Sequence, residues 1–232
     1  RGSNEFVSYV TEHSRIPVLG HGEGICHVYV HEDADLQKAF DVALDSKVQY
    51  PAVCNAMETL LVHKDIARSF LPDMVAQFRR AGVEVRGCPR TMELAKDEGV
   101  VPATEEDWKK EYSDLIVSIK VVDGVNEAME HINRYGSRHT ESIVTESHDV
   151  AARFMEFVDA ANVFQNASTR FSDGFRYGLG AEVGISTGKI HARGPVGVEG
   201  LTIYKYKLFG KGQTVASYSK GLRKFKHRVL SE

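Results

Sequence analysis

The sequence predicts a three-layer α/β/α fold, in which helices cover both faces of a largely parallel sheet. Short runs of β-branched and aromatic residues alternate with longer segments whose apolar residues recur at helical spacing through most of the 232 residues. Such alternation is typical of parallel sheets, because a helix returns the chain from each strand to the start of the next. With 42% hydrophobic and 26% charged residues, the chain has an ordinary globular composition and can form one large core or two smaller ones.

The expected strands are short apolar runs at 18–19, 25–31, 59–63, 83–86, 115–122, 142–145 and 163–164, and strand character returns at 198–209. The expected helices have apolar residues three and four apart and occupy 5–13, 35–47, 66–81, 91–98, 125–135 and 147–158. Residues 166–200 instead are rich in glycine, serine and arginine. A loop-rich segment that follows a regular scaffold often lines a site.

Charge and cysteine content exclude several classes of protein. The net charge of −3 does not indicate a bulk basic surface for nucleic acid. Cys26, Cys54 and Cys88 are odd in number, lie far apart and form no CxxC pair, which argues against a disulfide framework or a structural zinc site and fits a reducing cytoplasm. No apolar run reaches membrane-spanning length. Because residues 1–4 lack an initiator methionine, we expect a piece of a longer protein.

Cys54 is the strongest candidate for a reactive group. It lies in YPAVCNAMET, a short loop between a predicted helix and a predicted strand, where its thiol can face a cleft. Cysteine is a strong nucleophile at neutral pH when its surroundings favour the thiolate. The alternative is a small buried apolar residue, which is the more frequent role of a lone cysteine.

Other motifs carry weaker signals. The glycine-rich stretches 20–24 and 178–184 lack the strand–loop–helix context of a phosphate-binding loop. His21, Glu23 and His27 have no recognised metal-ligand spacing, so no metal site is predicted. The remaining histidines considered are interpreted as surface or hydrogen-bonded residues: His63, His131, His139 and His191.

The loop 166–173 combines hydroxyls, an amide, an arginine and a carboxylate. Arg170 can bind a carboxylate with two hydrogen bonds and Asp173 can bind an ammonium group, so the loop suits a small zwitterion. A solvated loop with an Arg–Asp surface pair is equally compatible with the spacing. The basic stretch 219–228 is interpreted as a solvated tail or terminal helix, with contact to an acidic partner as the alternative.

Four long stretches resemble a known family. They are IPVLGHGEGICHVYV, YPAVCNAMETLLVHKD, HINRYGSRHTESIVTE and NASTRFSDGFRYGLGAEVGISTGKIHARGPVGVEGLTIYKY. They are similar to the C-terminal catalytic portion of the gamma-glutamyl phosphate reductase family, within the aldehyde dehydrogenase superfamily. The resemblance covers nearly all of residues 1–212, and the last twenty residues carry no matching motif.

The resemblance implies an aldehyde dehydrogenase-like catalytic domain and a reaction. Cys54 would attack L-glutamyl 5-phosphate to form a thioester, and NADPH would reduce it to L-glutamate 5-semialdehyde in proline biosynthesis. The backbone N–H of Cys54 would stabilise the tetrahedral oxyanion. His21 occupies the place where oxidising superfamily members carry a water-activating glutamate, which fits a reductive enzyme.

The resemblance also assigns residues and segments. Asn166, Ser168 and Arg170 are expected to contact the substrate. Glu111 is expected to contact the nicotinamide-side ribose of the cofactor, and Gly2 and Ser3 its pyrophosphate. The expected segments are a remnant of the dinucleotide-binding domain at 1–34, a catalytic domain at 35–196, an oligomerisation strand at 197–212 and a basic tail at 213–232.

Two kinds of function remain open. The chain is either the catalytic part of an active reductase or a catalytically incomplete module that binds substrate or supports assembly. A cysteine hydrolase is a weaker third reading, because no histidine follows Cys54 in a recognisable triad context. We expect the chain to form a homo-oligomer and to be functionally coupled to glutamate 5-kinase. The choice between NADPH and NADH depends on residues upstream of this sequence.

Overall fold

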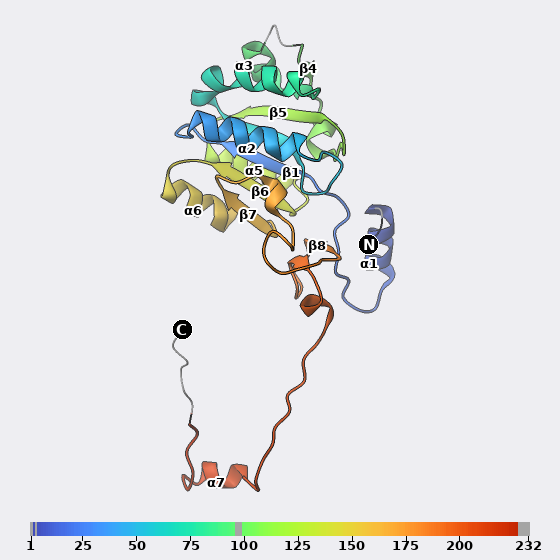
Figure 1. The fold of residues 1–232 in the computed structure, drawn as a ribbon, viewed down its shortest axis with the longest axis vertical. Coiled ribbons are helices and arrows are strands. Elements are labelled where there is room, and N and C mark those ends of the chain that lie inside the picture. Colours follow the sequence, from blue (N-terminus) through green and yellow to red (C-terminus); the bar gives the residue numbers. More distant parts are fainter. Residues whose placement is uncertain (1, 3, 96–98, 227–232) are drawn as a thin grey trace. The chain divides into compact units, whose positions relative to one another are not determined.

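The computed structural model describes residues 2, 4–95 and 99–226. By their contacts, the residues fall into two units, Arg1–Leu201 and Thr202–Glu232. The first unit contains the sheet, its helices and the candidate site (Figure 1). None of the described helices has the length and apolar character needed to span a bilayer.

The first unit contains a parallel seven-stranded sheet, as the alternating pattern predicts. The strand order is β4-β3-β5-β2-β1-β6-β7. The strands are β1 (Cys26–Val30), β2 (Met57–His63), β3 (Glu84–Gly87), β4 (Val101–Pro102), β5 (Ile116–Val122), β6 (Thr140–Val144) and β7 (Asn162–Gln165). Every pairing in this sheet is parallel, so the amino ends of neighbouring strands lie at the same edge.

Helices cover both faces of the sheet (Figure 1). One group comprises α2 (Leu36–Val48), α3 (Lys64–Arg80) and α4 (Pro89–Leu94), and the other α5 (Val125–Tyr135) and α6 (His148–Phe157). Alternate residues of β1 face different cores, because successive side chains of a strand point to opposite faces. Val28 and Val30 pack in the core with α2 and α3, whereas Tyr29 packs in the core with α5 and α6.

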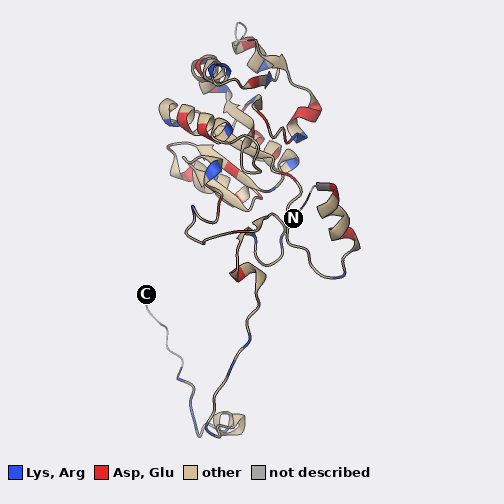
Figure 2. Cartoon of the chain, turned by 45° about the vertical axis from the view of Figure 1, so that its right-hand side comes forward, with Lys and Arg blue, Asp and Glu red and all other residues tan. Residues whose placement is uncertain are grey.

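Smaller elements flank this sandwich. The helix α1 (Asn4–His13) precedes it, and the short 3₁₀ helices are η1 (Glu105–Lys109), η2 (Thr169–Phe171) and η3 (Glu199–Leu201). The strands β8 (Gly184–Ser186) and β9 (Gly194–Val196) form a separate antiparallel hairpin. Acidic and basic residues are interspersed over the elements of the first unit, whereas residues 202–226 carry lysines and arginines and no acidic residue (Figure 2).

Most predicted elements are confirmed, and their caps explain their boundaries. Asp35 accepts a hydrogen bond from the Lys38 backbone N–H at the start of α2, and Ser147 does the same from Val150 at the start of α6. The strand predicted at 18–19 is wrong, since no sheet partner pairs with it. The end of the helix predicted at 91–98 lies outside the described residues. The structure also adds β4, β8 and β9, which are too short to give a clear pattern.

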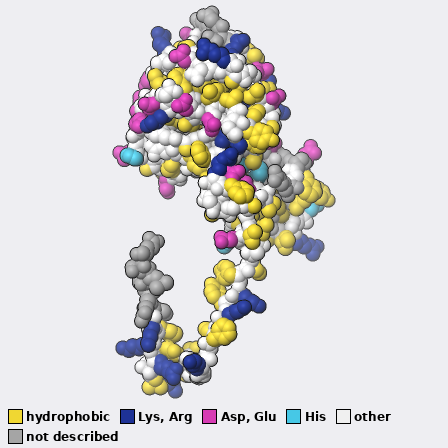
Figure 3. Space-filling view, in the orientation of Figure 1, with side chains coloured by type: hydrophobic (Ala, Val, Ile, Leu, Met, Phe, Trp, Pro, Cys, Tyr) yellow, Lys and Arg dark blue, Asp and Glu magenta, His cyan; other side chains and the backbone are white. Residues whose placement is uncertain are grey.

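The second unit lacks the expected strand. Residues 202–210 have no regular secondary structure in the described part of the chain, and the short helix α7 (Val215–Ser219) follows. Apolar side chains of this segment are exposed, among them Ile203 (98%) and Phe209 (92%). Figure 3 shows hydrophobic side chains along the extended segment. The run of apolar and β-branched residues gave the segment its strand character, but no strand in the described residues pairs with it. The predicted division at 34, 196 and 212 stays a prediction.

Two buried ion pairs join the central strands to their surroundings. Lys47 of α2 contacts Glu58 of β2 with Nζ and Oε2 2.6 Å apart, and Glu58 Oε1 accepts a hydrogen bond from the Ser113 backbone N–H at 3.3 Å. His27 of β1 donates its backbone N–H to Glu141 Oε2 of β6 at 2.7 Å, and its Nδ1 lies 2.9 Å from the same oxygen. Burial raises the pKa of both carboxyl groups, and the cationic or imidazole partner offsets part of that cost.

The Lys47–Glu58 pair should be costly to break from one side. Lys47→Met leaves a carboxylate buried without its partner, and we expect a loss of about 3–5 kcal/mol in the free energy of unfolding. The matched control is Lys38→Met, which breaks the exposed Lys38–Glu146 pair and should not change stability measurably. Urea denaturation measures both, and equal effects would contradict this reading.

Candidate functional site

The candidate site forms where four neighbouring strands begin. His139 directly precedes β6, Gly24 lies just before β1, Cys54 precedes β2, and Glu111 lies before β5. These strands are adjacent in the order β6-β1-β2-β5, and all are parallel. The segments that lead into them therefore meet at the amino edge of the sheet, although they are up to 115 residues apart in sequence (His139 against Gly24).

The Cys54 loop is held by backbone contacts. It lies between α2 and β2, as the sequence predicts, and the Ala56 N–H closes a turn on the Val53 carbonyl at 2.9 Å. The Cys26 thiol donates to the Cys54 carbonyl oxygen at 3.3 Å. Gly24 packs so closely that a Cβ there would overlap the Cys54 backbone. The loop therefore rests against the segment that enters β1, and this contact fixes its position.

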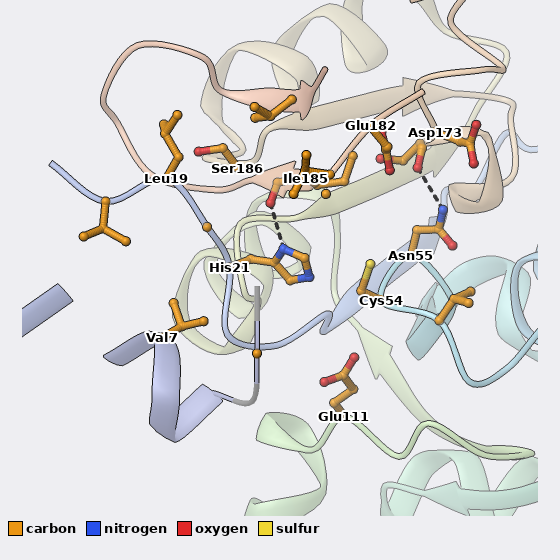
Figure 4. A pocket seen from close by; sticks show the side chains of 18 of the residues that line it. Val7, Leu19, His21, Cys54, Asn55, Glu111, Asp173, Glu182, Ile185 and Ser186 are labelled. Atoms are coloured by element: carbon orange, nitrogen blue, oxygen red, sulfur yellow. Dashed lines mark hydrogen bonds between the residues drawn. The ribbon is translucent and has the colours of Figure 1, made fainter. Parts of the chain in front are cut away.

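A cavity of about 610 Å³ opens above this loop (Figure 4). Figure 4 shows the Cys54 thiol next to His21 and Asn55, with Glu111 on one side and Asp173 on the other. The remaining wall comes from α1, from the segment 18–20, from the loop after β7 and from the β8–β9 hairpin. Cys54 is partly exposed, whereas Cys26 and Cys88 are buried. Of the three thiols, Cys54 is the one that a substrate in this cavity can reach.

His21 is oriented by the hairpin. Its Nδ1 lies 2.7 Å from the Ile185 carbonyl oxygen of β8. A carbonyl can only accept, so Nδ1 carries a proton, and in the neutral ring the lone pair is on Nε2. His21 is thus presented to the cavity in one tautomer, by a hydrogen bond that links residues 164 positions apart.

Glu111 supplies a carboxylate to the same cavity. Burial raises the pKa of this group, and nearby Glu23 adds to the rise, while a hydrogen bond from the Gly24 backbone N–H opposes it. The loop that carries Glu111 is tied to β2 through the Ser113–Glu58 hydrogen bond. Gly2 also lines the cavity, so two of the residues expected to bind the cofactor lie on its wall.

The loop after β7 supplies both positively and negatively charged side chains to the cavity wall. Arg170 is 7% exposed and donates from Nε to Gln49 Oε1 at 2.9 Å. Arg176 donates to the Arg170 carbonyl oxygen at 2.6 Å and lies 3.5 Å from Asp173. Burial and the neighbouring Arg176 lower the pKa of Arg170. Arginines and a carboxylate on one wall can take both ends of an amino acid.

The structure places two predicted substrate residues away from the cavity. Asn166 adopts a positive φ of 52°, and its side-chain amide pairs with the backbone of Thr145. Ser168 is buried, contacts Ser46 at 3.2 Å and accepts the Arg170 backbone N–H. Both shape the loop that carries Arg170, and neither lines the cavity. Ser3, which was also predicted to bind the cofactor, lies outside the described residues.

Sequence reasoning did not single out several lining residues. Asn55 donates from Nδ2 to the Ser172 carbonyl oxygen at 2.8 Å, and this bond joins the Cys54 loop to the loop after β7. Arg176 and Glu182 also line the cavity, and Glu182 accepts the Gly174 backbone N–H. Asn55 is adjacent to the candidate nucleophile, which could have identified it. Arg176 and Glu182 carried no local signal, because only the folded loop brings them to the cavity.

The fold and this arrangement define a class of protein. The fold is similar to that of the acetylating aldehyde dehydrogenase of Geobacillus thermoglucosidasius, with a TM-score of 0.64, 19% identity and 90% of this chain and 56% of that chain covered. The protein therefore has the aldehyde dehydrogenase-like fold. No family model matches the sequence.

The relatives make the assignment specific. The gamma-glutamyl phosphate reductase of Pelotomaculum thermopropionicum is 60% identical over 232 residues, which is 100% of this chain and 53% of that protein. The crystal structure of the Thermotoga maritima gamma-glutamyl phosphate reductase has a TM-score of 0.87 and 52% identity, covering 92% of this chain and 51% of that one. The chain belongs to the gamma-glutamyl phosphate reductase family, and it spans about half the length of the curated relatives it matches.

The close approach of Gly24 to the Cys54 loop gives a direct test of this geometry. Gly24→Ala places a methyl group against the Cys54 backbone and should reduce the free energy of unfolding by about 1–3 kcal/mol. Gly188→Ala is the matched control, since its Cβ would meet only Ile190 Cγ1 at 3.9 Å. Urea midpoints measure both variants. A Gly24→Ala protein as stable as the control would show that the loop does not rest on Gly24.

Proposed function

We propose that this chain is the acyl-transfer part of a reductase that converts L-glutamyl 5-phosphate into L-glutamate 5-semialdehyde and phosphate, with NADPH as reductant, in proline biosynthesis. The observation that carries the proposal is the position of Cys54. It is a partly exposed thiol in a fixed loop on the wall of a cavity that also presents arginines and carboxylates. The names of the close relatives support the same activity.

The first step is acyl transfer to the thiol. The Cys54 thiolate attacks the acyl carbon of L-glutamyl 5-phosphate, a sulfur–carbon bond forms, and phosphate departs with the bonding electron pair. The tetrahedral oxyanion needs donors in a site with little water. The Cys54 backbone N–H is a candidate, because the Ala56–Val53 turn fixes the peptide beside it.

The cavity suits the nicotinamide end of a dinucleotide. Glu111 can accept hydrogen bonds from ribose hydroxyls, and Gly2, on the same cavity wall, is proposed to lie near the cofactor pyrophosphate. When bound, NADPH supplies the hydride that reduces the thioester carbon. The chain's own part is then to hold the thiohemiacetal until the carbon–sulfur bond breaks, which releases the aldehyde and restores the Cys54 thiolate.

Recognition of the substrate falls to the loop after β7. Arg170 is proposed to bind the α-carboxylate and Asp173 the α-ammonium group. Asn166 and Ser168 act in this proposal by shaping that loop. His21 replaces the glutamate with which oxidising aldehyde dehydrogenases activate water, since a reductase must keep its thioester from hydrolysis.

The setting of the enzyme follows from the same proposal. Three free cysteines suit a reducing cytoplasm. The exposed apolar segment 203–209 is proposed to pair with a second copy in a homo-oligomer, and glutamate 5-kinase, which would supply the unstable acyl phosphate, is the proposed functional partner.

A second candidate function has one observation in its favour. The chain spans only about half of its relatives' length, so it can be a substrate-binding or assembly module that does not turn over. In that case Cys54 would still react with acyl donors, but no reduction would follow.

The reverse reaction tests the proposal. Given pyrroline-5-carboxylate, phosphate and NADP⁺, we expect phosphate-dependent NADPH formation that falls at least about 10³-fold in Cys54→Ser, since the thioester cannot form. Cys88→Ser is the matched control, because Cys88 is buried outside the cavity.

The same assay separates the two candidates. It is repeated with this chain joined to the part of the Pelotomaculum thermopropionicum relative that it does not span. If only the joined protein turns over, the chain alone is a substrate-binding or assembly module. Turnover that survives Cys54→Ser in either form contradicts the proposed mechanism.

A further inference from the structure

Three potential metal ligands meet at the entrance to β1, β2 and β6. The Cys54 sulfur, one ring nitrogen of His21 and one ring nitrogen of His139 all lie within 4.8 Å of one another. The three residues come from segments that only the parallel sheet brings together. The rings of His21 and His139 meet edge to face, with centroids 5.1 Å apart.

His21 offers a defined donor atom. Its Nδ1–H is committed to the Ile185 carbonyl, so the lone pair is on Nε2. A histidine whose second nitrogen donates to a backbone carbonyl is the usual arrangement for a metal ligand, because that bond fixes the tautomer and the ring orientation.

His139 offers a second donor atom, and it is fully buried. Its Nδ1 lies 2.8 Å from the Thr140 hydroxyl and 3.8 Å from the Cys26 sulfur. Because the Cys26 thiol proton is donated to the Cys54 carbonyl, the Cys26 sulfur can accept from Nδ1, as can the Thr140 hydroxyl. In the tautomer with the proton on Nδ1, the lone pair is on Nε2. Nε2 has no hydrogen-bond partner in the described part of the chain.

The unpaired Nε2 of His139 needs an explanation, since buried polar atoms nearly always have a hydrogen-bond partner. A neutral imidazole whose ring nitrogen has an unused lone pair can ligate a metal ion.

We propose that His21, Cys54 and His139 form a site for a thiophilic divalent cation, with Zn²⁺ as the best fit, and that the cation reversibly blocks Cys54. Two imidazole nitrogens and a thiolate are the ligands of Zn²⁺ and related metals, whereas Mg²⁺ and Ca²⁺ require oxygen. Binding transfers the thiol proton to solvent and forms a metal–sulfur bond. Cys54 and His21 line the cavity, from which a water molecule would complete the tetrahedron.

The site needs a modest contraction. Metal–sulfur and metal–nitrogen bonds of about 2.3 and 2.0 Å at tetrahedral angles place the ligand atoms about 3.5 Å apart. Cys54 and His21 are only partly buried, so their side chains can move toward the fixed ring of His139. The statement that the cation inhibits rests on the proposed function, whereas the binding itself does not.

Co²⁺ is the probe, since it takes the place of Zn²⁺ and its thiolate complexes absorb strongly. Titration of the 232-residue chain should give one equivalent of a tetrahedral Co²⁺ complex with a sulfur-to-cobalt charge-transfer band, and Zn²⁺ should displace it. Cys54→Ser should abolish the band. His21→Ala should weaken Co²⁺ binding at least about tenfold.

Matched controls identify the site. Cys26→Ser removes the other thiol near His139, and Cys88→Ser removes the remote one, so both should retain the band. His63→Ala tests the other possible cation cluster, Glu32–His63–Asp65, which contains no sulfur. The result for His139→Gln is interpreted only if circular dichroism shows that this variant is folded. If it is not folded, the His21→Ala result decides whether the site exists.

The outcomes are separable from those of the reductase proposal, because binding is measured without turnover. A charge-transfer band that persists in Cys54→Ser, or unchanged Co²⁺ affinity in His21→Ala, overturns the site. No charge-transfer band in the parent protein overturns it as well.

Discussion

The parallel pairing of four central strands is the interaction on which the candidate site depends. Hydrogen bonds fix the register of β1 against β2 and β6, and of β2 against β5, at positions such as His27↔Glu141 and Thr59↔Ser118. Because every strand runs the same way, the four segments that enter them must converge at one edge. Cys54 faces the cavity from one of these segments.

Buried polar pairs strengthen the same edge. The Lys47–Glu58 pair joins α2 to β2 and the His27–Glu141 pair joins β1 to β6, and His27, Glu58 and Glu141 are each the second residue of their strand. Such pairs add little net stability, but a misplaced register would leave a charge buried without its partner. We infer that they make the geometry of the Cys54 loop specific, while the apolar cores on both faces provide most of the stability.

The sequence predicted the sandwich well and the site only in part. Alternating strand and helix signals are local, so β1, β2, β5 and their helices were expected close to their observed bounds. Cys54, Glu111 and Arg170 were expected at a site, and they line one cavity. Asn166 and Ser168 belong to the same loop as Arg170, but a residue count could not show that their side chains turn to Thr145 and Ser46.

What the sequence could not show depends on tertiary contacts. His21 was considered for a metal site only with Glu23 and His27, its neighbours in sequence. Its partners in space, Cys54 and His139, belong to other strand entrances. Strand character at 198–209 misled because the apolar residues that produce it are exposed, in a segment that pairs with no strand of the described residues.

The central claim is that the fold presents Cys54, of the three cysteines, to a cavity. Limiting iodoacetamide followed by peptide mapping measures this most directly, with the urea-unfolded chain as the reference for intrinsic reactivity. The account predicts that Cys54 in the folded chain is alkylated at least about a hundredfold faster than buried Cys26 and Cys88, and that the difference vanishes on unfolding. Equal alkylation of the three thiols in the folded chain would contradict it.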